Sequence, residues 1–447
     1  MQNLSELTET LLVSAKRAGA DAADAIATDG RALSINVRNG ALEQAESAEG
    51  VEIGLRVLVG QRQACVAASD VSADTISAVA ERAVAMAQIA PEDPNIGLAD
   101  ASQVARDWDL DALDLQDAVA DPAPAELQSA AVETEAIALG TEGITKTDTV
   151  AASSSRTRIF LSASNGFSGG YTRTGYSLFC VAITGHGTEM ERDYAGESRV
   201  YHADLPTPEE IGRLAAERTL ARAGARKPPT GAFPVLYDER VASGLIGHLL
   251  SAANGASVAR GSSWLRDKLG AQVLPHGLDI VEDPHRARVS GSKPFDAEGL
   301  PTRRRSIVEN GVLKGWTLDL ATARKLGMES TASAARGTSG PPSPSLTNIA
   351  LTQGTQTRDD LIADMGTGLL VTSLIGSTIS PTTGDYSRGA SGFWVENGQI
   401  TYPVNECTIA GNLNGMLQSI VPANDARTYV SRVVPSLLVD GLTIAGD

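Results

Sequence analysis

The segment TTGDYSRGASGFWVENGQITYPVNECTIAGNL, residues 382–413, decides the fold of the C-terminal half of the chain. Its second part, FWVENGQITYPV (393–404), places Asn397-Gly398 between two apolar runs. Asn-Gly accepts the left-handed backbone of a tight two-residue turn, so this pattern predicts a β-hairpin. The same signal occurs in VENGVLKGW (308–316), and this half of the chain is therefore expected to be rich in hairpins.

The first part of the opening segment predicts a glycine-rich loop over residues 384–392. Asp385 and Arg388 carry opposite charges within one turn of chain, and Tyr386 lies between them. Such a loop could place a carboxylate, a phenol and a guanidinium at a cleft. Alternatively, the loop satisfies its own charges and only leads into the hairpin. The residues alone leave both interpretations open.

The N-terminal half combines helical patterns with antiparallel strands. Asn39-Gly40 within RALSINVRNGALEQA (31–45) predicts a further hairpin. Strands and helices do not alternate regularly, which favours the α+β class over a doubly wound parallel sheet. The linker ARKPPTGAF (225–233) is expected to separate two domains. We expect an N-terminal α+β domain of antiparallel strands with flanking helices, residues 1–224, and a β-rich C-terminal domain, residues 234–447.

Composition argues against several classes of function. The chain of 447 residues has a formal net charge of −17, and its only notable basic run contains Arg303 and Arg304. Nucleic-acid binding needs clustered Lys and Arg, so we expect no nucleic-acid partner and interpret this run as a strand edge or an interface. No apolar stretch is long enough to span a membrane, and the three cysteines form no CxxC pair. We expect a cytoplasmic protein with no membrane partner.

The stretch GLIGHLLSAANG (244–255) predicts part of an amphipathic helix that carries one histidine, His248. His248 shares a face with Leu245 and Leu249, so it should point inward. A zinc-peptidase helix needs two histidines about one turn apart and a neighbouring glutamate, but residues 241–260 contain no acid and no second histidine. We interpret His248 as a core or cleft-lining residue.

The motif GFSGG (166–170) matches G-x-S-x-G, the nucleophile elbow of serine hydrolases. That motif works only between a strand and a helix, where the turn presents the serine hydroxyl. Here the alternating run YTRTGYSLFCVAIT (171–184) follows, which is typical of a strand. We therefore expect a hairpin turn at this motif instead of a catalytic serine.

Residues 382–413 resemble the C-terminal signature of the TldD/PmbA family, in its PmbA/TldE branch. The resemblance continues through RGSSWLRDKLGAQV (260–273), FDAEGLPTRRRSIVENGVLKGW (295–316) and PSLLVDGLTIAG (435–446). It covers nearly the whole chain. The family resemblance implies two branches that work together: TldD carries HExxxH on a helix and a downstream cysteine, whereas PmbA/TldE lacks these ligands and pairs with it.

Aligned without gaps on residues 261–263, the HExxxH positions of TldD fall on Ile246, Gly247 and Ser251. None of these residues can bind zinc or act as a base, and His248 lies between them. The resemblance therefore implies a degenerate metallopeptidase helix, no catalytic residue and no metal ligand in this chain. Zinc is expected only in the TldD-like partner.

Three functional hypotheses follow. In the first, the chain is the metal-free partner of a TldD-like zinc peptidase that trims or degrades unfolded or extended peptides, including the maturation of peptide antibiotics. In the second, it is a stand-alone module that adds a peptide to an exposed hairpin edge. The third, ranked last, is a self-sufficient metallopeptidase using His248, His276 or His285. The sequence does not decide whether the chain forms a homodimer in the absence of the TldD-like partner.

At a cleft or an interface we place six side chains, namely His248, Asp385, Tyr386, Arg388, Arg303 and Arg304.

Overall fold

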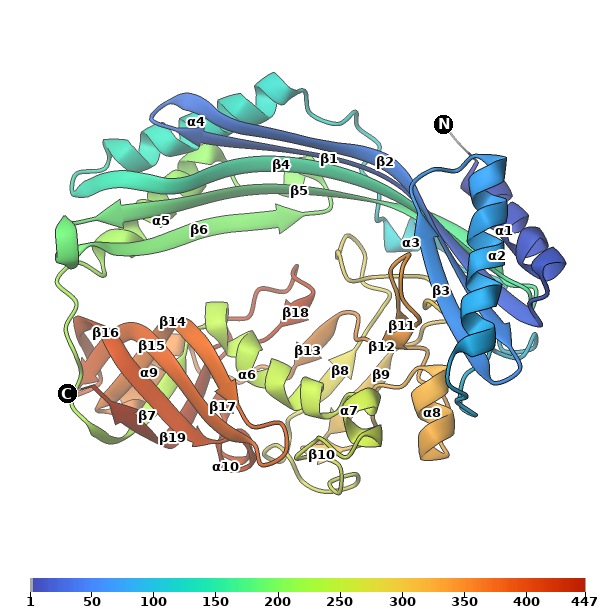
Figure 1. Cartoon of the computed structure of the whole chain (residues 1–447). Coiled ribbons are helices and arrows are strands. Elements are labelled where there is room, and N and C mark those ends of the chain that lie inside the picture. The colour runs from blue at the N-terminus through green and yellow to red at the C-terminus, as the bar shows by residue number, and fades with distance from the viewer. Residues whose placement is uncertain (1–2, 447) are drawn as a thin grey trace.

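The N-terminal half of the chain forms one long antiparallel sheet that arches over the C-terminal half (Figure 1). The computed structural model describes residues 3–446. The strands of the sheet are β1 (Ala22–Arg38), β2 (Ala41–Val59), β3 (Arg62–Ala68), β4 (Ile144–Ala163), β5 (Ser168–Thr184) and β6 (Glu191–Arg199). They lie in the order β3-β2-β1-β4-β5-β6.

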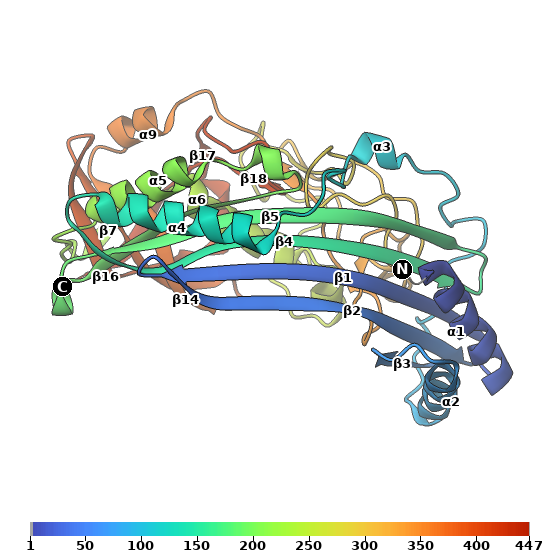
Figure 2. The same cartoon turned by 90° about the horizontal axis from the view of Figure 1, so that it is seen from above.

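Helices cover one face of this sheet near both of its ends (Figure 2). They are α1 (Leu4–Ala18), α2 (Ala73–Ile89), α4 (Pro124–Gly140) and α5 (Pro208–Leu220). The short helix α3 (Leu110–Leu113) lies beside the β5 edge, and 3₁₀ turns occur at Gly187–Glu189 and His202–Asp204. At one end, α1 and α2 bury Leu11 and Val84 against Leu55 of β2. At the other end, α4 packs Leu127 over Leu178 of β5. The sheet thus has two separate apolar cores on its helical face.

The turns of the sheet follow from local sequence. Asn39 and Gly40 have φ angles of 54° and 74°, as a tight hairpin turn requires, and they join β1 to β2. The GFSGG motif joins β4 to β5, so Ser168 begins a strand and no helix follows it. Both expected hairpins are confirmed, and the geometry of a nucleophile elbow is not formed here.

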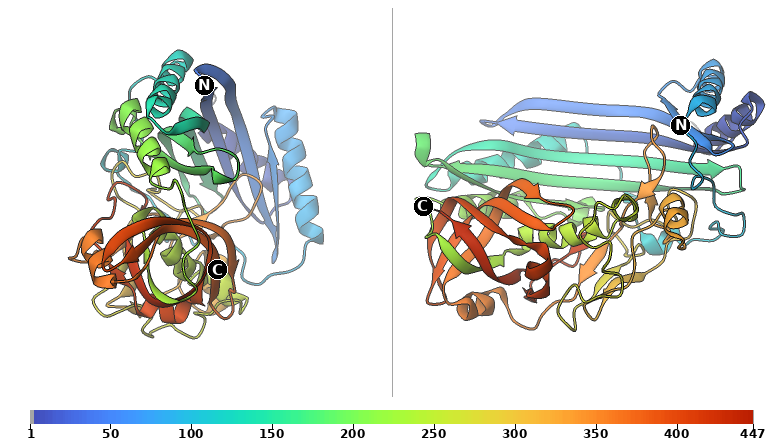
Figure 3. Two further views of the ribbon diagram at one scale, coloured as in Figure 1. Left: turned by 90° about the vertical axis from the view of Figure 1, so that its left-hand side faces the viewer. Right: turned by 60° about the horizontal axis from the view of Figure 1, so that its bottom comes forward.

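Five strands of the C-terminal half close into a barrel. The left panel of Figure 3 shows this barrel end-on. They are β7 (Gly231–Tyr237), β14 (Gly368–Ile379), β15 (Asp385–Glu396), β16 (Gln399–Asn412) and β19 (Leu437–Ala445). The order is β16-β15-β14-β7-β19, and pairing of β16 with β19 closes the ring. Buried Tyr237, Leu369 and Trp394 belong to its apolar core. The hairpin expected at Asn397-Gly398 is confirmed as the β15–β16 turn.

The rest of this half is made of short elements. A second sheet, in the order β10-β9-β8-β13-β18, contains β8 (Ile280–Glu282), β9 (Arg305–Glu309), β10 (Val312–Leu313), β13 (Ile349–Leu351) and β18 (Arg432–Val433). Small strands are β11 (Ala334–Ala335), β12 (Ser343–Pro344) and β17 (Val421–Pro422). The helices are α6 (Glu239–Ala252), α7 (Gly255–Ala259), α8 (Leu320–Leu326), α9 (Arg358–Met365) and α10 (Leu413–Gln418). The α+β class predicted from the sequence is confirmed.

The prediction of a loop over residues 384–392 is wrong, because strand β15 covers Asp385–Glu396. Its glycines serve close packing between strands: a Cβ at Gly392 would collide with the carbonyl of Leu370, and one at Gly389 would lie 2.5 Å from Cγ2 of Ile375. Glycine inside a strand often marks such an approach of neighbouring backbone. Asp385, Tyr386 and Arg388 are therefore strand residues with fixed directions.

A segment between β11 and β12 reaches up to the N-terminal sheet (Figure 1). Its Thr338 lies so close to Gly54 of β2 that a Cβ at Gly54 would overlap the main chain of Thr338. Beside it, Arg336 has a fully buried side chain that bonds to Asp24 of β1. The second oxygen of Asp24 accepts from Nε of Arg56 at 2.6 Å. Arg336 thus joins the C-terminal half to the sheet through a buried carboxylate that it shares with Arg56 of β2.

Candidate functional site

Helix α6 places the candidate histidine at the border of the apolar core. The helix starts directly after β7, where the Asp238 carboxylate accepts from the backbone N–H of Arg240 at 3.2 Å. Leu245 and Leu249 are buried. His248 is half-buried, and its ring meets the ring of Tyr386 edge-on with 5.8 Å between centroids. The helix is confirmed, and its histidine is reachable from solvent.

Arg388 completes a small polar cluster around this histidine. The pKa of His248 is lowered by burial and by the positive charge of Arg388, and both effects favour the neutral imidazole. The hydroxyl of Tyr237 donates to that of Tyr386 at 3.4 Å, and burial raises the pKa of both phenols. Nε of Arg388 is buried and has no hydrogen-bond partner. The cluster therefore presents one cation and no carboxylate.

Three of the six predicted site residues lie elsewhere. Asp385 is exposed, and its pKa is lowered because it accepts hydrogen bonds from Thr383 (2.6 Å) and Asn412 (2.9 Å). Adjacent strand residues point to opposite faces, which separates Asp385 from Tyr386. Arg303 and Arg304 are exposed ahead of β9. The structure brings together only His248, Tyr386 and Arg388.

The donor set on α6 does not fit zinc. Ile246 is fully buried in the core, Ser251 is exposed, and a side chain at Gly247 would meet Nη1 of Arg432 at 3.1 Å. His248 is then the one imidazole of the helix, and the neighbouring Arg388 charge repels a cation. Within the described residues 3–446, no three His, Cys, Asp or Glu side chains gather as metal ligands.

An ionic network that sequence reasoning missed ties α6 to the edge strand β6. Arg427 donates to Glu239, the first residue of α6, at 2.7 Å and to Glu197 of β6 at 3.2 Å. Glu197 also pairs with Arg199, whose guanidinium lies 3.8 Å from the ring centre of Tyr429. These side chains come from segments about 200 residues apart, and no local motif marks them.

A cavity of about 660 Å³ lies beside this network, between the sheet and the C-terminal half. It is lined by serines of β4 and β5 on one side, and by Arg288, Arg427 and Tyr429 on the other. Its volume falls in the range of ligand sites. This cavity is therefore a space of ligand size between the two halves.

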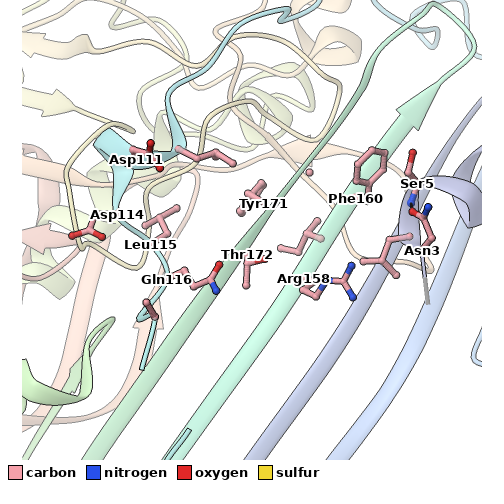
Figure 4. Close-up of a pocket in the computed structure, with 15 residues that line it drawn as sticks. Asn3, Ser5, Asp111, Asp114, Leu115, Gln116, Arg158, Phe160, Tyr171 and Thr172 are labelled. Carbon is pink, nitrogen blue, oxygen red and sulfur yellow. Dashed lines mark hydrogen bonds between the residues drawn. The ribbon is translucent and has the colours of Figure 1, made fainter. Parts of the chain in front are cut away.

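A further cavity, of about 650 Å³, lies beside the start of α1 (Figure 4). Its walls include Asn3 and Ser5 of the α1 start, Asp111 of the α3 segment, and Arg158 of β4. The Arg158 charge is compensated by Asp29 at 3.1 Å. None of the six predicted site residues contributes to this cavity.

Comparison with known proteins connects this fold to a family. Residues 23–87, 109–223 and 230–446 match the models of PmbA/TldA metallopeptidase domain 1, central domain and C-terminal domain. The chain is 38% identical over 437 residues to Metalloprotease PmbA of Escherichia coli O157:H7, covering 97% of this chain and 94% of that protein. The chain belongs to the PmbA/TldD family. The resemblance seen in the sequence is confirmed.

Further relatives and solved structures are also similar to this chain over nearly its whole length. A Metalloprotease PmbA homolog of Haemophilus influenzae is 36% identical, over 100% of this chain and 97% of its own. A solved Bacteroides thetaiotaomicron protein, described as a candidate modulator of DNA gyrase, has a TM-score of 0.91 at 27% identity, with coverage of 99% and 98%. TldE from Thermococcus kodakarensis, at 19% identity and a TM-score of 0.85 with coverage of 98% and 100%, shares the fold.

In the described part of this PmbA/TldD-family chain, no helix is long and apolar enough to cross a membrane.

Proposed function

We propose that this chain is the metal-free subunit of a cytoplasmic peptidase complex, in which a TldD-like relative holds the zinc. The observation that carries the proposal is α6: a peptidase zinc needs three protein ligands and an open position for water, but the helix offers one histidine beside an arginine. Relatives of this chain are called metalloproteases. That activity is then a property of the complex, and this polypeptide alone does not catalyse hydrolysis.

The substrate class that fits this role is an unfolded or extended peptide, including precursors of peptide antibiotics. Strand β14 supports it, because β7 pairs with β14 only over Leu369–Val371 whereas β14 continues to Ile379. Toward its end, Ile375 is 74% exposed. An extended peptide can add to such an open strand edge through main-chain hydrogen bonds.

The test is metal analysis combined with peptide hydrolysis. The purified chain should hold far less than one zinc per molecule and should cleave a casein-derived peptide only after the TldD-like protein is added. His248→Ala should leave hydrolysis by the complex nearly unchanged. Stoichiometric zinc together with strong hydrolysis by the isolated chain, abolished in His248→Ala, would establish the self-sufficient peptidase instead.

A stand-alone peptide-binding module is the second candidate, and the same open edge of β14 favours it. Co-purification separates the two. If the tagged chain never recovers a TldD-like protein at low or high salt, yet binds extended peptides, the stand-alone module is correct. Size-exclusion chromatography of the isolated chain also decides whether it forms a homodimer.

A further inference from the structure

A third cavity, of about 340 Å³, lies at the junction of the two halves. Neither the residues around His248 nor the open edge of β14 contributes to it. The sheet contributes an apolar wall with Ile26 of β1, and Ile159 and Leu161 of β4. The C-terminal half contributes Lys293 and Phe295. Exposed Gly337 also belongs to the lining, so the cavity reaches the surface there. This volume suits a small organic molecule.

Two cations face this cavity without a salt-bridge partner. Arg173 of β5 donates to the carbonyl oxygens of Ser290 and Ser292, both at 3.1 Å, and its buried Nε has no partner. Lys293 donates to the carbonyl oxygen of Ala334 at 3.0 Å, which leaves two of its three donors free. Arg173 also donates to the hydroxyl of Tyr171 at 3.4 Å and lies 5.1 Å from the centre of its ring. Within residues 3–446, neither cation forms a salt bridge with a carboxylate.

The other two charged side chains around the cavity, Asp296 and Arg336, each have a partner within the protein. The Asp296 carboxylate accepts from the backbone N–H groups of Glu298, Leu300 and Ala334, at 2.9–3.1 Å. The Arg336 guanidinium bonds to Asp24. Burial and the nearby Arg173 charge act together to lower the pKa of Lys293, against the opposing effect of Asp296 and Glu282. Two like charges held near one another in a half-buried space favour an anion between them.

We propose that this cavity binds a small organic carboxylate. The carboxylate accepts hydrogen bonds from Lys293 and Arg173, and the apolar part of the ligand packs on Ile159 and Leu161. Such a carboxylate is either a free branched-chain acid or the C-terminal leucine-like residue of a peptide. A ligand here contacts both halves of the chain and therefore stabilises their junction. The site is independent of the subunit role proposed above.

The experiment is calorimetric titration of the full chain with 4-methylpentanoate and its neutral isostere 4-methylpentanamide. Charge-assisted hydrogen bonds are the stronger ones, so the amide should bind at least about tenfold more weakly. N-acetyl-Ala-Leu, with a free or an amidated C-terminus, then distinguishes a peptide end from a free acid: tighter binding of the free-ended peptide than of 4-methylpentanoate assigns the site to peptide ends.

Lys293→Met keeps the apolar stem and removes the charge, and it should weaken binding of 4-methylpentanoate about tenfold or more. Lys268→Met removes an equally flexible, exposed cation and should change nothing. Equal binding of acid and amide by the unmodified chain, or no binding of either, overturns the proposal even if Lys293→Met does not fold. Unchanged affinity in a folded Lys293→Met variant overturns it as well.

Discussion

The C-terminal barrel and the junction between the two halves differ in how much buried charge they contain. The barrel is filled by apolar side chains such as Trp394, which is 2% exposed, and its ring of strands is closed by β16 and β19. The junction also has an apolar cluster, in which Phe167 of the sheet half packs on Phe295. It adds buried charge, because Asp24 lies between Arg56 and Arg336. The barrel should therefore respond mainly to changes in side-chain volume, whereas the junction should respond in addition to changes in charge and pH.

The largest effect is expected at the junction. Asp24→Asn leaves two buried guanidinium groups without a counter-charge, and breaking a buried ion pair costs about 3–5 kcal/mol. Urea denaturation should show this loss as an earlier unfolding transition. Arg31→Gln breaks a fully exposed pair with Glu49 and serves as the control, with no measurable change expected. A loss as small as the control's would mean that the junction does not depend on charge.

In the barrel, Leu369→Ala should cost about 2–5 kcal/mol, because a closed ring of strands cannot collapse into the cavity left behind. The same denaturation experiment measures it, and the loss should be independent of pH. Leu42→Ala, at a site 47% exposed on β2, should stay within about 0.5 kcal/mol. Similar losses for the two leucines would contradict the packing argument.

The junction also predicts a pH dependence. Burial and the neighbouring Asp296 raise the pKa of Glu298 to about 8. Because this value lies above that of the unfolded chain, the native state holds a proton that the unfolded state releases. The stabilisation is complete at low pH and is lost as pH rises toward 8, with a slope of up to about 1.4 kcal/mol per pH unit.

Glu298→Gln removes this titration while keeping an oxygen for the backbone N–H of Leu320. Urea unfolding at pH 5 to 9 should then give a flatter profile for the variant than for the unmodified chain. Identical profiles would show that Glu298 ionises normally in the folded protein.

The smallest effect is expected at His248, which is half-buried at the border of the apolar core. His248→Ala removes one edge-on ring contact with Tyr386 and should cost about 0.5–1.5 kcal/mol. His248→Phe keeps an aromatic edge and should recover part of the loss in the same thermal or urea unfolding measurement. A loss as large as that of Leu369→Ala would place His248 in the core rather than at its border.

Local features of the sequence predicted the turns well. Asn39, Asn310 and Asn397 each adopt a left-handed φ of 49–54° before a glycine, because the Asn-Gly pair itself favours that backbone. Helix α6 was also predictable, since the spacing of its leucines is a local pattern. The two-domain division at residues 225–233 stays a prediction.

Features that depend on contacts between distant segments could not be predicted from the amino-acid sequence. Gly389 and Gly392 suggested a glycine-rich loop, but in the structure β14 approaches both positions so closely that a Cβ would collide with it. The partners Glu197, Glu239 and Arg427 meet only after folding and carry no periodic signal. His248, Tyr386 and Arg388 were named individually, and only the course of β15 brings them together.

Closure of the barrel has a consequence for the order of folding. The N-terminal sheet grows mainly by hairpins, such as β1–β2 and β4–β5, whose partners are close in sequence. The barrel cannot close until Val235 of β7 meets Val439 of β19, about 200 residues later. Pairing of such distant strands requires closing a long loop, which loses conformational entropy before any contact forms. This entropy loss slows folding. The sheet should therefore form first and serve as a template onto which the barrel half assembles.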